Sequence, residues 1–136
     1  MNELERKFFD KKSEYIELFE SGKVEEAFKM MKEVKAMFEE PIIQEGLYYL
    51  LVEDFINMCI KTEKYELANK YLSLLFVAGG TRADYGDKEF IAGELAYAQG
   101  EMELAKELFY ISNFKSEGDL LRGKENKKYR ELIRGM

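Results

Sequence analysis

The clearest structural pattern in the chain is Tyr97-Ala98-Gln99-Gly100-Glu101-Met102-Glu103-Leu104-Ala105. Gly100 interrupts a helical pattern, and glycine is the residue that most readily ends a helix in the left-handed conformation. Ala105 follows five positions later, and the large apolar Phe109 lies four positions beyond it. Two helices pack closely where a small residue lies at their crossing point. The stretch therefore predicts a helical hairpin, with one helix ending near Gly100 and the next beginning just after it.

Two earlier stretches repeat this pattern. They are Gly22-Lys23-Val24-Glu25-Glu26-Ala27 and Glu63-Lys64-Tyr65-Glu66-Leu67-Ala68. The three alanines are 41 and 37 residues apart, and a large apolar residue follows each by four positions, namely Met31, Leu72 and Phe109. A hairpin repeated at such a spacing is typical of helical repeats, in which each hairpin packs on its neighbours.

Apolar residues elsewhere recur at steps of three and four, as on one face of a helix. Residues 42–61 are apolar almost all round, which predicts a central buried helix. Pro41 separates the first two hairpins, because the residue before a proline is disfavoured in a helix. The glycine-containing stretch 78–86 separates the second from the third. We expect one all-α domain over 1–136, with the domain organised as hairpins at about 2–39, 42–77 and 87–113 and a C-terminal cap at 114–136.

The composition excludes several kinds of catalytic and metal site. The chain has no His and a single Cys, Cys59. Without an imidazole there is no Ser-His-Asp or Cys-His pair, and a structural zinc site needs four Cys or His ligands. Acidic clusters such as Glu25-Glu26 lack the fixed ligand spacing and turn glycine of a calcium loop. We expect no catalytic residue, no metal and no cofactor, and we expect Cys59 to be buried and inert.

The charge is unevenly distributed. The net charge of −6 is composed of −9 over residues 1–113 and +3 over residues 114–136. An acidic body repels nucleic-acid phosphates and attracts basic protein surfaces. No apolar run reaches the roughly 20 residues of a membrane span, and the N-terminus has no apolar signal core. We therefore expect a cytoplasmic protein whose partner is another, basic protein, with no nucleic acid and no membrane, and with self-association through the open ends left as an alternative.

The acidic pair Glu53-Asp54 interrupts the apolar run of residues 42–61. We expect Asp54 to lie at an exposed edge and Glu53 to line a groove. The alternative is that Glu53 pairs with a basic residue, either within the chain or on a partner. No pair of acids in the sequence has a context that favours a raised pKa, so we expect no carboxylate-based enzyme.

The third hairpin resembles the tetratricopeptide repeat family. Gly93 stands where that family has the glycine of its first helix, residues 97–105 match its turn, and Ser112 takes its second small position. The first two hairpins depart at these positions, with Tyr15, Ile56, Val34 and Leu75, and their spacing exceeds the family's 34-residue period. The resemblance implies a right-handed stack of about three tetratricopeptide-like hairpins with a short C-terminal helix.

The resemblance also implies a concave groove lined by the first helix of each hairpin. The transferred groove positions are Lys12, Ile16, Glu53, Asn57, Phe90, Glu94 and Tyr97. Members of the family that clamp the C-terminal carboxylate of chaperones carry Lys, Arg and Asn there, and this chain matches only at Lys12 and Asn57. Acids at Glu53 and Glu94 would repel an acidic tail. We expect acids and aromatic anchors to meet a basic partner, with Arg82 and Tyr85 as further contacts from the loop.

Residues 118–129 are similar to the ending of small bacterial tetratricopeptide-type proteins, with Leu121 in place of an aromatic. Some of those proteins look like immunity partners of secreted toxins. The resemblance implies a non-catalytic protein–protein interaction module that inhibits a basic partner, such as a toxin, by occluding its active or substrate-binding surface. The alternative is a general scaffold or adaptor that binds an extended peptide. The sequence leaves open whether the C-terminal segment caps the stack or fills the groove.

Overall fold

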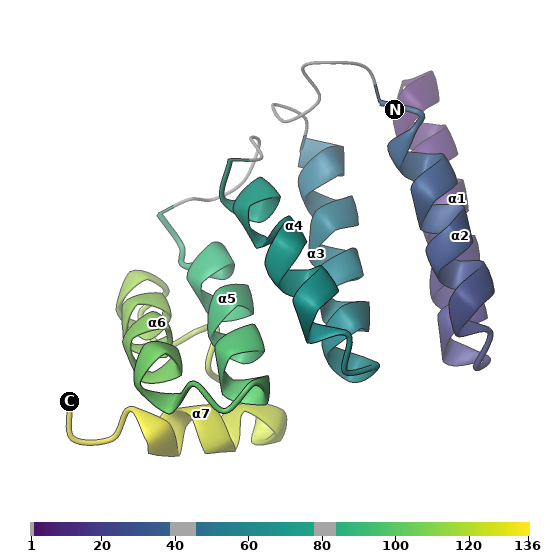
Figure 1. Ribbon diagram of the computed structural model, residues 1–136. Coiled ribbons are helices and arrows are strands. Elements are labelled where there is room, and N and C mark those ends of the chain that lie inside the picture. The colour runs from purple at the N-terminus through teal and green to yellow at the C-terminus, as the bar shows by residue number, and fades with distance from the viewer. Residues whose placement is uncertain (1, 39–45, 78–83) are drawn as a thin grey trace.

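The computed structural model describes residues 2–38, 46–77 and 84–136. These residues form helices and no strand, which confirms the all-α class. The helices are α1 (Glu3–Glu20), α2 (Val24–Lys35), α3 (Gly46–Lys61), α4 (Tyr65–Val77), α5 (Asp87–Ala98), α6 (Met102–Lys115), the 3-10 helix η2 (Lys124–Asn126) and α7 (Lys127–Leu132). They lie in three pairs in chain order, with α7 across the end of the third pair (Figure 1). Pro41, Arg82 and most of the expected linker lie outside the described residues.

The same left-handed turn joins the helices of all three pairs. Gly22, Glu63 and Gly100 have φ angles of +85°, +60° and +80°. In each turn the following amide donates to a carbonyl five positions earlier, Lys23 to Leu18 at 2.9 Å, Lys64 to Cys59 at 2.8 Å and Glu101 to Ala96 at 2.9 Å. These bonds satisfy carbonyls that a helix end would otherwise leave unpaired. The repeat seen in the sequence is therefore a repeated hydrogen-bonded turn.

Small residues let the helices of each pair pack closely, as the sequence predicts. Ala27, Ala68 and Ala105 are fully buried. In the third pair Gly93 of α5 lies directly against Phe109 of α6, and a Cβ atom added to Gly93 would come within 2.9 Å of the Phe109 ring. Side chains larger than glycine would therefore force this pair apart.

The core has two parts. The larger part lies among α1 to α5 and includes Phe8, Tyr15, Ile56, Leu75 and Leu95. Within it, α3 contacts both helices of the first pair and α5 contacts both helices of the second. Cys59 is buried here, as expected from the sequence, and burial raises the pKa of its thiol to about 11.

The smaller part of the core joins α5 and α6 to the C-terminal segment through Ala96, Ala105, Phe109, Leu121 and Tyr129. Leu121 is fully buried although it lies outside any helix. Arg130 of α7 holds this turn, because its guanidinium donates to the carbonyls of Leu121 at 2.6 Å and Gly123 at 2.7 Å. The C-terminal segment is thus an integral part of the third helix pair.

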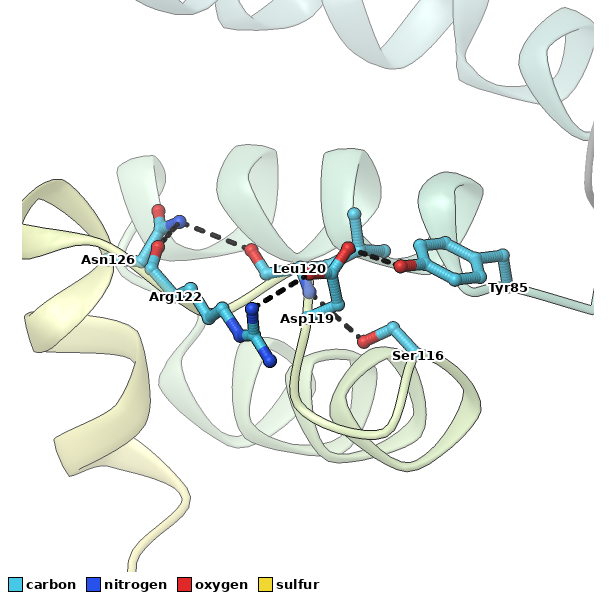
Figure 2. A network of polar contacts seen from close by, with 6 residues as sticks. All are labelled: Tyr85, Ser116, Asp119, Leu120, Arg122 and Asn126. Carbon is cyan, nitrogen blue, oxygen red and sulfur yellow. Dashed lines mark hydrogen bonds and ion pairs between the residues drawn. The ribbon is translucent and has the colours of Figure 1, made fainter.

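Side-chain hydrogen bonds fix the connection between α6 and α7 (Figure 2). The hydroxyl of Ser116 accepts a hydrogen bond from the backbone N–H of Leu120 at 3.1 Å. The side-chain amide of Asn126 donates to the backbone carbonyl of Leu120 at 3.2 Å. The hydroxyl of Tyr85, just before α5, donates to Asp119. The start of the third pair is therefore bonded directly to the segment that closes it.

None of the helices within the described ranges is long and apolar enough to cross a membrane.

Candidate partner-binding face

Seven of the residues expected to line a groove come from three helices that contact one another in order. Lys12 and Ile16 lie on α1, Glu53 and Asn57 on α3, and the remaining three on α5, namely Phe90, Glu94 and Tyr97. All seven side chains are half-buried. We call these seven residues the α1/α3/α5 face. Electrostatic interactions link the three helices. The charge of Lys12 acts to lower the pKa of Glu53, and the charge of Glu53 acts to raise the pKa of Glu94.

Asp54 lies at the contact between α1 and α3. One of its carboxylate oxygens accepts from Lys12 at 2.6 Å and from the hydroxyl of Tyr15 at 2.6 Å. The Asp54 side chain is only 17% exposed, so the expectation of an exposed edge is wrong. The reason is that Tyr15 is fully buried, and a buried hydroxyl needs an acceptor. Burial, followed by the hydrogen bond with Asp54, raises the pKa of Tyr15.

Glu53 and Glu94 form a pair of acids whose charged forms are both disfavoured. Burial, followed by the charge of Glu53, raises the pKa of Glu94 to about 7, while Lys128 and Lys61 oppose the shift. Burial also raises the pKa of Glu53 against a hydrogen bond with Tyr49. The sequence-based expectation that no acid pair has a raised pKa is therefore wrong. It fails because the two residues belong to different helices and only the fold brings them together.

No ion pair in residues 2–38, 46–77 and 84–136 involves Glu53 or Glu94, and lysines act on them only from a distance. Taking a carboxylate out of water is unfavourable unless a counter-charge or hydrogen-bond donors replace the water. The face therefore has two partly desolvated carboxyl groups and an incomplete set of internal counter-charges. Such an arrangement can accept a cationic side chain from outside.

Tyr129 of α7 covers the aromatic part of the face. Its ring lies 5.1 Å from the ring of Tyr97 and 5.9 Å from that of Phe90, both in edge-to-face geometry. The ammonium of Lys128 lies 5.3 Å from the Tyr97 ring centroid. The C-terminal segment thus both caps the third helix pair and covers two expected partner anchors. Sequence reasoning gave Lys128 and Tyr129 no place at the site, because nothing local indicates that they fold back onto α5.

The other predicted contacts lie in different settings. Tyr85 has a structural role through its bond to Asp119, and its predicted partner contact stays a prediction. Arg82 lies outside the described residues. Ile16 packs against the larger core and also borders a shallow hollow of about 520 Å³ beside α1, together with Phe9 and Glu17. In the part of the chain that the structure describes, no group of three or more Cys, Asp or Glu side chains is arranged to hold a metal ion.

Comparison of the chain with protein-family models, with curated proteins and with solved structures found no match.

Proposed function

We propose that the chain is a non-catalytic protein–protein recognition module built as a right-handed, tetratricopeptide-like stack of three hairpins. The three equal turns, the fully buried Ala27, Ala68 and Ala105, and the packing of each pair on the next support the stack. Such stacks present the first helices of their hairpins as a binding surface. A single buried cysteine suits the reducing cytoplasm, which is the compartment we propose.

The observation that carries the proposal is the acid pair of Glu53 and Glu94. An arginine or lysine of a partner, placed near the two carboxyl groups, would supply the counter-charge that the described part of the chain does not bring close. Charge-assisted hydrogen bonds of this kind are among the stronger polar contacts at an interface. The chain's net charge of −6 would also speed the approach of a basic partner.

Our finer proposal is inhibition of a basic protein, as in a toxin and its immunity partner, by covering that protein's working surface. Tyr129 covers the aromatic end of the face at Phe90 and Tyr97, which shortens any continuous groove. A shortened face suits a folded partner that inserts one basic side chain better than a long extended peptide. The general peptide-binding scaffold remains the alternative function.

Capture of partners from the source cells tests this function. The wild-type chain is compared with Glu53→Gln/Glu94→Gln and with the control Glu26→Gln/Glu66→Gln, which neutralises two exposed acids on α2 and α4. We expect one basic protein to be captured at low salt, to be retained by the control, and to be lost from the Glu53/Glu94 variant. Capture of several unrelated proteins, unchanged in the Glu53/Glu94 variant, would contradict the inhibitor proposal and favour a scaffold.

A further inference from the structure

A second surface lies on the opposite side of α3 from Glu53 and Asn57. Residues of α2, α3 and α4 surround a hollow of about 350 Å³ there, which we call the α2/α4 groove. The α3 residues that line it are Tyr48, Leu51, Val52 and Phe55. At 3.6 residues per turn these positions point away from the side of α3 that carries Glu53 and Asn57. The groove is therefore separate from the α1/α3/α5 face.

The floor and walls of the α2/α4 groove are apolar and aromatic. Its floor residues are buried, namely Phe28, Met31, Tyr48, Leu51 and Val52. The ring of Phe55 meets that of Phe28 at 5.4 Å and that of Tyr71 at 4.8 Å between centroids, both edge to face. Aromatic rings held in this way form a pre-shaped wall that loses little entropy when an apolar side chain packs on it.

The rim of the groove is basic although the chain is acidic. It carries four lysines, Lys32, Lys35, Lys64 and Lys70, and one acid, Glu25. Lys64 pairs with Glu25 at 3.4 Å, but the Glu25 side chain is 87% exposed, so this pair is weak. Within the described residues no ion pair involves Lys32, Lys35 or Lys70.

Two of the lysines lie over aromatic rings of the groove. The ammonium of Lys35 is 5.1 Å from the centroid of Tyr71, and that of Lys64 is 5.0 Å from the centroid of Phe28. These cation–π contacts hold the two charges close to the apolar hollow. A ligand that packs an apolar group into the hollow would therefore meet positive charge at its edges.

We propose that the α2/α4 groove binds an acidic peptide segment of a partner protein through one apolar anchor side chain flanked by Asp or Glu. The hollow takes the anchor, and the lysines of the rim pair with the flanking carboxylates. A nucleic acid offers negative charge along its whole length and would be repelled by the acidic remainder of the chain. A short acidic segment meets only the local positive rim. This inference goes beyond the proposed function, because it assigns a second site that takes a ligand of the opposite charge.

Fluorescence anisotropy with a labelled synthetic peptide tests the groove directly. The probe has the sequence Glu-Asp-Glu-Gly-Phe-Glu-Asp-Glu, and a second peptide replaces Phe by Ser. We expect the first peptide to bind at least about tenfold more tightly than the second, because only the first has an anchor. Equal affinity for the two peptides, or no binding of the first, would overturn the proposal. Tighter binding of an oligothymidine strand than of the first peptide would also overturn it.

Charge and anchor variants assign the binding to the groove. Lys32→Glu/Lys70→Glu should weaken the first peptide by about tenfold or more, whereas Lys23→Glu/Lys29→Glu, at exposed positions outside the groove, should change it by less than about threefold. Leu67→Ser on the groove wall should weaken binding, and Leu104→Ser on the outside of α6 should not. Equal losses in test and control variants would overturn the assignment. Sedimentation could also overturn the assignment. If the chain forms a dimer that only the variant Lys32→Glu/Lys70→Glu dissociates, a second copy of the chain fills the groove.

Discussion

Tyr129 of α7 stacks on Phe109 of α6, with ring centroids 4.1 Å apart and ring planes inclined by 20°. Phe109 is also the residue that presses against Gly93, so a single column of contacts runs from α5 through α6 to α7. Tyr129 therefore covers the Phe109 ring where α7 meets the third helix pair, and we expect this pair to depend on that contact for its stability.

Replacing Tyr129 by Ala should lower the free energy of unfolding by about 2–4 kcal/mol, because the buried ring fills space between three other aromatic rings. Urea unfolding followed by circular dichroism measures the change. The matched control is Tyr110→Ala on α6, where the side chain is 44% exposed and a change of less than about 1 kcal/mol is expected. Equal effects at the two positions would show that the C-terminal segment does not support the fold.

Gly93→Ala should destabilise the chain by about 1–3 kcal/mol, although Gly→Ala within a helix usually stabilises it. The added methyl group would lie within 2.9 Å of the Phe109 ring. Combining Gly93→Ala with Phe109→Leu separates the two effects, because the smaller side chain makes room for the methyl group. The loss in the double variant should then be smaller than the sum of the two single losses in thermal unfolding. Simple additivity would argue against the close contact.

Glu63→Gly should stabilise the chain by about 1 kcal/mol. Glu63 holds the left-handed position that glycine holds in the other two turns, and a side chain is unfavourable there. Chemical denaturation provides the measurement. Glu66→Gly, one turn later in α4, serves as the control and should destabilise, because glycine is a poor helix residue. A loss of stability in both variants would contradict the shared turn.

Glu94→Gln should stabilise the chain at pH 8 but not at pH 4. The pKa of Glu94 is raised from 4.5 to about 7, so between these values the folded state binds more protons than the unfolded state. The free energy of unfolding therefore falls as the pH rises through this window, and Gln removes that loss. We expect a gain of roughly 1–3 kcal/mol at pH 8 that vanishes near pH 4, below the unfolded pKa of 4.5. Exposed Glu26→Gln is the control, and a pH-independent difference would refute the assignment.

The features that sequence reasoning predicted are local ones. Gly100 at a left-handed turn and Ala105 at a helix crossing are determined within a few residues, and both are confirmed. Which of the two acids, Glu53 or Asp54, is held against α1 is not determined locally. It depends on the buried hydroxyl of Tyr15, which lies 39 residues away in sequence and donates a hydrogen bond to Asp54. Helical periodicity within α3 does not determine which of the two acids lies against a neighbouring helix.

The surfaces that the sequence did not reveal are assembled from distant segments. Lys32 on α2 and Lys70 on α4 resemble ordinary solvated lysines until packing on α3 brings them around one hollow. Tyr129 likewise has no local feature that indicates Phe109 as its neighbour. In both cases the relevant contact depends on how helices are placed, and not on the pattern within any one helix.

The most direct test of the central claim is an NMR titration of the side-chain carboxyl carbons of Glu53 and Glu94, in the free chain and with the captured basic partner. We expect Glu94 to titrate near pH 7 in the free chain and well below that value in the complex, because the partner supplies the counter-charge. Titration of both groups near 4.5 in the free chain, or a Glu94 curve that the partner leaves unchanged, would contradict it.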